Sequence, residues 1–480
     1  MTPTDTLTDP LAQIPAGASA AADATARAEG LAALQAAFGP RLSRQAAVRA
    51  QHCHTVNWIP PEPPDAVICP RSTAEVARIV EICAAHRLPV IPFGAGSSLE
   101  GHVNAPRGGV CLSLREMDRI LEISPADMSV VIQPGVTRSR LNEELRATGL
   151  FFPIDPGADA TLGGMAATRA SGTNAVRYGT MRDMVMGIEA VLPDGRVMRA
   201  GGAARKSSAG YDLTRLLVGS EGTLGILTEL RLRLFGQPEA VAAGIAAFPD
   251  LESACNAVIL TIQMGLPVAR IELMDEMQIR ACNAYSGLSL AERPTLVFEF
   301  HGSPAAVADE VAQFRALAEE MGATGVEHAT DPDSRQRLWK ARHDAHWANL
   351  ALRPGARNMT TDVCVPISRL ADCVARTQED LRASGITATI VGHVGDGNFH
   401  VLPLFDPGDA AMLGRIKAFV HRLVDRAQAM GGTCTGEHGI GQEKRRYLEA
   451  ETGAVALSAM AAIKRALDPH DIMNPGKILP

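Results

Sequence analysis

Several patterns that would assign the protein to other classes are missing from its 480 residues. The nine cysteines include no Cys-x-x-Cys pair, and an odd, scattered set of this kind argues against a disulfide framework and a zinc–thiolate site. The 46 basic residues do not exceed the 53 acidic ones, and the net charge of −7 argues against a nucleic-acid-binding protein. With 46% hydrophobic and 21% charged residues, the composition is that of an ordinary folded chain.

Targeting and membrane signals are missing as well. Residues 1–30 contain Asp5, Asp9 and Asp23 and no charged segment followed by an apolar run, so neither a signal peptide nor a mitochondrial transit peptide is expected. No stretch reaches the ~18 consecutive apolar residues of a transmembrane helix. We therefore expect a cytoplasmic protein with reduced thiols, and leave open a peripheral contact with a membrane.

Changes in residue pattern divide the chain into parts. A lead over residues 1–59 contains a predicted helix over 29–38, and a proline-rich segment at 60–64 follows it. Residues 66–93 then read as strand, helix and strand, with Ser72 and Glu75 as a capping box, which predicts a parallel strand pair. Short β-rich runs continue to Gln237-Pro238, where we place a domain boundary. Beyond it, strands alternate with amphipathic helices.

The glycines concentrate in three segments, 92–101, 156–174 and 219–226. The first follows a predicted strand but matches neither the Walker A loop nor the dinucleotide fingerprint. The second consists almost entirely of small residues with hydroxyl and amide groups, which lets the backbone lie against a large planar ligand. A tight turn would explain any one of them. Three in succession indicate a buried, extended cofactor that carries phosphate groups.

These segments resemble the FAD-binding domain of the vanillyl-alcohol oxidase / p-cresol methylhydroxylase (PCMH) flavoprotein superfamily. Within it, 155–160 and 171–183 are most similar to the D-lactate dehydrogenase (cytochrome) family, whose relatives are D-2-hydroxyglutarate dehydrogenase and the glycolate oxidase flavin subunit. The resemblance implies an α+β fold with a two-subdomain, PCMH-type FAD-binding domain over 60–237. It further implies an α+β cap domain with an antiparallel sheet over 238–440, and a C-terminal tail, 441–480, that returns to the FAD domain.

The resemblance also implies which residues contact FAD. Some superfamily members attach the flavin covalently through a histidine, and the corresponding position here is Ser98, so we expect non-covalent FAD. His102, just after this loop, is interpreted as a polar surface residue. The expected FAD contacts are Pro92, Gly94, Gly96, Ser97, Ser98, Gly101, Pro156, Gly157, Thr161, Gly163, Gly164, Ala166, Ser171, Gly172, Asn174, Tyr178, Glu221, Gly222, Gly225, Ile226 and Asn474.

A candidate metal site follows from a second motif, at 392–400. Asp396-Gly397 predicts a two-residue hairpin turn, which would pair His393 with His400 and place both imidazoles on one face. Two such histidines suit one metal ion, with a third ligand from the glycine-rich segment around Glu437 and His438. The resemblance assigns His393, His400 and Glu437 to a divalent metal and His438 to the catalytic base. Zn²⁺ and Mn²⁺ are the first candidates.

The expected reaction is the oxidation of a D-2-hydroxy acid to a 2-oxo acid. The substrate would chelate the metal, His438 would take the hydroxyl proton, and the α-hydrogen would leave as hydride to flavin N5. Electrons would pass to a separate acceptor such as a cytochrome, a quinone or an electron-transfer flavoprotein. Arg342, on a predicted cap helix, suits bidentate binding of the substrate carboxylate and matches the family's substrate arginine.

The substrate's size is predicted from a short stretch of the cap. Thr360-Thr361-Asp362 stands where the hydroxyglutarate enzymes tend to have a lysine, which favours D-lactate, with D-2-hydroxyglutarate and glycolate as alternatives. A non-redox flavin transferase resembling alkylglycerone-phosphate synthase would want consecutive histidines in the cap, whereas His438 is isolated. A metal-dependent hydrolase would leave the three glycine segments unexplained. No nucleic-acid partner and no transmembrane segment are expected.

Overall fold

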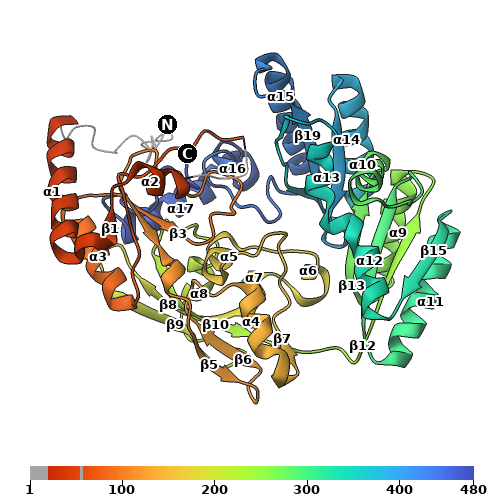
Figure 1. Ribbon diagram of the computed structural model, residues 1–480, viewed down its shortest axis with the longest axis horizontal. Helices are drawn as coiled ribbons and strands as arrows, with labels where there is room; N and C mark the ends of the chain where they lie inside the picture. The colour runs from red at the N-terminus through yellow and green to blue at the C-terminus, as the bar shows by residue number, and fades with distance from the viewer. Residues whose placement is uncertain (1–19, 54–57) are drawn as a thin grey trace, which may run out of the picture.

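The computed structural model describes residues 20–53 and 58–480, so the first 19 residues of the predicted lead lie outside the described part. The chain forms two lobes (Figure 1), with the first half of the sequence on the left and the cap on the right. Helix α1 (Ala20–Phe38) begins nine residues before the helix predicted over 29–38, because the preceding alanines are strong helix formers. It packs through Leu31 and Leu34 on α3 (Thr73–Ala85).

A four-stranded sheet in the order β1-β2-β4-β3 forms the first subdomain. Strands β2 and β3 both run parallel to β4, which lies between them, so the predicted parallel strands are not neighbours. Ser72 caps α3 by accepting the Glu75 N–H, but the Glu75 carboxylate pairs with Arg41 and does not complete the capping box. The elements are β1 (Leu42–Ser43), α2 (Ala46–Gln51), β2 (Ala66–Ile68), β3 (Val90–Phe93) and β4 (Val110–Ser113).

The second subdomain is an antiparallel sheet in the order β5-β6-β10-β8-β9. Its buried face carries alternating apolar residues, such as Leu230 and Leu232, and is covered by the glycine-rich helix α5. The elements are β5 (Ile120–Ser124), β6 (Ser129–Ile132), α4 (Arg138–Leu145), β7 (Leu150–Phe151), α5 (Leu162–Thr168), α6 (Ala175–Tyr178), α7 (Met181–Met184), β8 (Val185–Val191), β9 (Val197–Gly201), α8 (Leu213–Leu217), β10 (Ile226–Arg233) and β11 (Phe235–Gly236).

The cap is built on an eight-stranded antiparallel sheet, with strands in the order β15-β12-β14-β13-β18-β19-β16 and β17 paired with β19. The elements are β12 (Ala240–Ala247), α9 (Leu251–Gln263), β13 (Val268–Met274), α10 (Glu276–Ser286), β14 (Thr295–Gly302), α11 (Pro304–Glu320), β15 (Thr324–Ala329), α12 (Pro332–His343), α13 (Ala345–Ala351), β16 (Arg357–Asn358), β17 (Val363–Cys364), α14 (Leu370–Ser384), β18 (Ala388–Gly392), β19 (Asn398–Phe405) and α15 (Ala410–Ala429). The predicted α+β class with an antiparallel cap sheet is confirmed.

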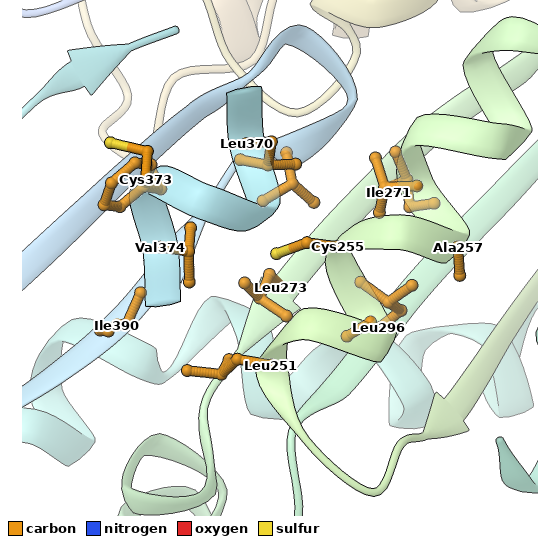
Figure 2. Close-up of a cluster of buried hydrophobic side chains, with 14 of the residues drawn as sticks. Leu251, Cys255, Ala257, Ile271, Leu273, Leu296, Leu370, Cys373, Val374 and Ile390 are labelled. Carbon is orange, nitrogen blue, oxygen red and sulfur yellow. The ribbon is translucent and has the colours of Figure 1, made fainter. Parts of the chain in front are cut away.

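The two faces of the cap sheet have different partners. Helices α9, α11, α14 and α15 bury one face, and Figure 2 shows side chains of α9 and α14 meeting over Leu273 of β13. Because successive strand residues point to opposite faces, Glu272 lies on the other face, which α10, α12 and α13 cover. This second face carries the candidate site.

The C-terminal segment lies against the first lobe (Figure 1). After α16 (Arg445–Thr452) and α17 (Ala454–Leu467), the Asn474 N–H donates to the Val90 carbonyl, and the Val90 N–H donates to the Ile472 carbonyl. The tail thereby extends the edge of the four-stranded sheet and brings Asn474 beside the first glycine segment. Across the described helices, we find none with the length and apolar character that crossing a membrane would take.

Candidate active site

A cavity of about 900 Å³ is lined by residues of both lobes. The glycine segments form the wall on the side of the first lobe, and the cap contributes Arg342, His393, His400, Glu437 and His438. Sixteen of the predicted FAD contacts line it: Pro92, Gly94, Gly96, Ser97, Ser98, Pro156, Gly157, Thr161, Gly163, Gly164, Ser171, Glu221, Gly222, Gly225, Ile226 and Asn474.

Five predicted contacts do not line the cavity, namely Gly101, Ala166, Gly172, Asn174 and Tyr178. Ala166 is fully buried in the core of the second subdomain, while the next residue, Ala167, faces the cavity. Gly101 packs on the Gln442 side chain, and a Cβ at Gly172 would meet the Asp155 backbone. Asn174 and Tyr178 are engaged by Arg270 and His301 of the cap. These five residues therefore pack behind the residues that line the cavity.

Unpartnered polar atoms show that the cavity fits a cofactor with phosphate and polar ring groups. Among the described residues, Ser98 Oγ, Thr161 Oγ1, Arg138 Nε and Asn474 Oδ1 are buried without a hydrogen-bond partner, and all four residues line the cavity. Buried polar atoms are normally satisfied, so such a group points to a bound ligand. The residues present therefore fit FAD.

His102 is not the surface residue that the sequence suggested. It is buried and lines the cavity, with Nε2 3.2 Å from Glu221 Oε2. The Glu221 carboxylate also accepts the N–H groups of Ile440 and Gly441 at 2.7 and 2.8 Å. Burial alone would raise the pKa of Glu221, but His102 and these two donors lower it below its usual value. Glu221 thus ties the third glycine segment to the segment that carries Glu437 and His438.

The predicted two-residue turn and the pairing of His393 with His400 are wrong. The ladder pairs Val391 with His400, residues 394–396 form a 3₁₀ turn, and Gly397 closes it at φ 78°. The shift amounts to two residues, and a two-residue shift keeps side chains on the same face. The two imidazoles therefore still meet, with ring centroids 5.4 Å apart.

Both histidines converge on Glu437. Its Oε1 lies 3.2 Å from His393 Nε2 and 3.4 Å from His400 Nε2, and one ligand atom from each of the three residues lies within 4.8 Å of the others. Glu437 Oε2 is buried without a partner among the described residues. Burial opposes ionisation, yet His393 holds the pKa of Glu437 well below its usual value. Two imidazoles and an anionic carboxylate with a free oxygen fit a divalent metal.

A set of polar contacts around these ligands orients them. His400 Nδ1 donates to the Thr361 carbonyl at 2.9 Å, and His393 Nδ1 donates to Glu272 Oε1 at 2.7 Å. Each contact places a proton on Nδ1, so Nε2 is the ring nitrogen that each histidine can offer to a metal ion. Sequence reasoning missed Glu272, although a single carboxylate inside the apolar run of β13 was a visible signal.

Asp362 holds the backbone of the Glu437 segment. Its Oδ2 accepts the N–H groups of Glu437 and His438 at 2.9 and 2.8 Å and the Thr435 hydroxyl at 2.7 Å. Its Oδ1 accepts from the Asn398 amide at 2.8 Å. Burial would raise the pKa of Asp362, but nearby cationic groups, His438 first among them, hold it well below its usual value.

His438 lies next to the three predicted ligands. Its ring stacks on His400 at a centroid distance of 5.1 Å and an interplanar angle of 6°. Its Nδ1 lies 3.6 Å from Glu100 Oε1, and the residue lines the cavity. Burial lowers the pKa of His438, but Asp362 and Glu100 outweigh burial and raise it above its usual value.

Arg342 lies on α12 with its side chain 16% exposed, and it lines the cavity. Its Nε donates to Glu272 Oε2 at 2.7 Å. A second arginine, Arg270, also lines the cavity and was not predicted. It is paired with Asp155 and Glu299 at 3.4 and 3.6 Å.

Comparison with known proteins covers both lobes. A family model described as "FAD binding domain" matches residues 64–201, and one described as "FAD linked oxidases, C-terminal domain" matches 237–478. A probable mitochondrial D-lactate dehydrogenase of Danio rerio is 50% identical over 90% of this chain and 88% of its own. A mitochondrial D-lactate dehydrogenase [cytochrome] of Arabidopsis thaliana is 46% identical over 87% of this chain and 74% of its own.

Among solved structures, p-cresol methylhydroxylase with substrate bound matches 95% of this chain and 97% of its own with a TM-score of 0.79. At 18% identity this likeness concerns the fold, and it confirms the predicted PCMH-type architecture. The prediction of a cytoplasmic protein is wrong, because both relatives are named as mitochondrial. That prediction rested on the composition of residues 1–30, whereas the relatives match along most of the folded chain.

Proposed function

The chain belongs to the FAD-linked oxidases, in the family of the D-lactate dehydrogenases (cytochrome), and from this premise we propose that it oxidises D-lactate to the 2-oxo acid with FAD and one divalent metal ion. The observation that carries the proposal is the convergence of His393, His400 and Glu437 on the wall of the cavity that the glycine segments also line. Arg342 and His438 line the same cavity.

The chain's own residues would bind and orient the substrate. Arg342 would hold the carboxylate through its terminal guanidinium nitrogens, since its Nε is already engaged by Glu272. His438 would receive the hydroxyl proton. Its raised pKa opposes this role until a cation is bound nearby, since positive charge disfavours protonated imidazole.

Two groups would supply the remaining chemistry. FAD, held by the glycine segments and Asn474, accepts the hydride when bound. The divalent metal, held by His393, His400 and Glu437, lowers the pKa of the substrate hydroxyl. A cytochrome is the electron acceptor that the names of the relatives suggest.

A small, apolar substrate side chain fits the cap side of the cavity best. Ala345, Val391 and Leu402 line it. Arg270, the arginine that could receive a second carboxylate, is already paired with Asp155 and Glu299. Binding D-2-hydroxyglutarate there would disrupt these buried pairs, which supports D-lactate over the dicarboxylate.

A stopped-flow substrate panel tests the proposal. Flavin bleaching is followed with D-lactate, L-lactate, glycolate and D-2-hydroxyglutarate, in the presence of Zn²⁺ or Mn²⁺. We expect the highest kcat/KM for D-lactate, and a clear preference for D-2-hydroxyglutarate would overturn the assignment. Absence of a flavin band after attempted FAD reconstitution would overturn the enzyme class.

Two histidine variants separate the proposed roles. His393→Ala should lose stoichiometric metal, whereas His438→Ala should keep the metal and lose flavin reduction by D-lactate. His421→Ala provides the matched control, because His421 is an exposed histidine on α15 whose contacts are with Asp425 and Tyr447. Full metal occupancy in His393→Ala, or unimpaired flavin reduction in His438→Ala, would contradict the corresponding role.

A further inference from the structure

We propose that Glu272 is a positioning residue that couples the metal ligand His393 to the substrate-binding Arg342, an inference that rests on the proposed function. Glu272 is 0% exposed and lies on β13, between the cap sheet and α12. One oxygen accepts from His393 Nδ1 and the other from Arg342 Nε, both at 2.7 Å. Both oxygens are therefore engaged, one by each of two residues on the cavity wall.

The contact with His393 selects the tautomer that can bind a metal. Because a carboxylate can only accept, it keeps a proton on Nδ1, and Nε2, 3.2 Å from Glu437 Oε1, is the ring nitrogen left to give up its proton to a metal ion. A histidine that ligates a metal through one ring nitrogen usually donates its other N–H to such a group.

The contact with Arg342 sets the direction of the guanidinium group. Nε is engaged by Glu272, so the terminal nitrogens are the donors left for a substrate carboxylate. A rigid carboxylate between the two groups thereby sets the separation between the metal ligand and the arginine. A 2-hydroxy acid that binds both must match this separation.

Burial makes the arrangement cooperative. A fully buried carboxylate is costly unless its charge is compensated, and here His393 and Arg342 provide both contacts. Loss of either partner leaves Glu272 under-compensated, and loss of Glu272 leaves both partners without their acceptor. Metal binding and substrate affinity should therefore change together when Glu272 is altered.

The test uses the Glu272→Gln variant of the FAD-loaded protein. A glutamine has one acceptor oxygen, which the charged Arg342 takes, so its NH₂ group faces His393 Nδ1 and favours the tautomer with the proton on Nε2. We expect the Kd for Zn²⁺ or Mn²⁺, measured by chelator competition, to rise about 10- to 100-fold. At saturating metal, KM for D-lactate should rise by a larger factor than kcat falls.

The matched control is Glu299→Gln. Glu299 is a buried carboxylate on the neighbouring strand, and it accepts from His301 Nε2 at 2.6 Å and Trp339 Nε1 at 2.8 Å without touching a predicted metal ligand. This variant should keep the wild-type metal Kd. Flavin content and circular dichroism of both variants report whether each is folded.

The double variant Glu272→Gln/Arg342→Met tests whether weaker metal binding in Glu272→Gln comes from the competition of Arg342 for the amide oxygen or from a general loss of structure in the cap. Without the arginine, the amide oxygen is free to accept from His393, so the metal Kd should recover toward the wild-type value. A Kd in Glu272→Gln within twofold of wild type, or no recovery in the double variant, would overturn the inference alone. Wild-type protein that binds no stoichiometric metal would overturn the proposed metal role and this inference together.

Discussion

Replacing Asp362 with asparagine should release the segment that carries Glu437 and His438. In the folded protein, Asp362 Oδ2 accepts from the backbone N–H groups of both residues and from the Thr435 hydroxyl. Oδ1 accepts from the Asn398 amide. An asparagine can present only one oxygen, so its NH₂ group would face the Asn398 NH₂ group, and three charge-assisted hydrogen bonds would become neutral ones.

The size of the effect follows from the hydrogen bonds. A hydrogen bond to a charged acceptor contributes about 1 kcal/mol more than a neutral one, so three of them weaken the anchor by about 3 kcal/mol. Since 1.4 kcal/mol corresponds to about a factor of ten, we expect kcat/KM for D-lactate to fall about 100-fold. Asparagine also removes the carboxylate that raises the pKa of His438, so the acid limb of the kcat/KM profile should move to lower pH.

Stopped-flow flavin reduction with D-lactate at saturating metal, over a series of pH values, measures both effects. Asp380→Asn is the control, because Asp380 is a largely buried carboxylate that pairs with Arg422 and Arg426 on the outer face of the cap. It should lower stability and leave kcat/KM within about twofold. If Asp362→Asn kept kcat/KM within threefold of wild type, the anchoring role would be refuted.

Three further variants test other parts of the structure. Arg342→Lys should raise KM for D-lactate about tenfold or more, because a lysine lacks the planar pair of donors with which a guanidinium group binds a carboxylate. Steady-state kinetics at saturating metal measure KM, and an unchanged KM would contradict binding of the substrate carboxylate by Arg342. Burial raises the pKa of Asp275 to about 8, so the folded protein binds the proton of this carboxyl group more tightly than the unfolded chain does. As the pH rises from about 4 to about 8, the free energy of unfolding should therefore decrease by up to about 1.4 kcal/mol per pH unit. Asp275→Asn should flatten that fall in denaturation curves recorded at several pH values, and an identical slope would argue against a protonated Asp275. Gly397→Ala should destabilise the cap by at least about 2 kcal/mol, because Gly397 has φ 78° and a Cβ there would lie 2.1 Å from the Val365 carbonyl oxygen. Thermal denaturation measures the loss of stability, and Gly408→Ala, where the nearest atom to an added Cβ is 3.8 Å away, is the control. Equal destabilisation of the two variants would contradict the steric explanation.

Much of the protein could be predicted because its chemistry is concentrated in short segments. A glycine-rich stretch such as 156–174 reports a backbone that must approach a ligand closely, whatever surrounds it. The family followed from 155–160 and 171–183. The residue types of the candidate metal ligands were likewise visible, since His393 and Glu437 lie in glycine-rich turns and His400 follows one closely.

Tertiary structure decided what surrounds those residues. Residue spacing predicted the wrong register for His393 and His400, because the turn at 394–396 is set by the docking of Gly397 against Val365. It also did not distinguish Ala166, which faces the core, from Ala167, which faces the cavity.

The contacts that orient the site come from distant parts of the chain, Glu272 on one cap strand and Asp362 beside another. A local sequence pattern determines which backbone conformation and which face a residue can adopt. It does not determine which buried carboxylate will meet a given imidazole, because that pairing depends on how strands far apart in sequence are ordered in the sheet. The sequence by itself therefore determined the family and the chemistry of the segments, and the fold of the cap decided how the ligands, the base and the arginine are oriented toward one another.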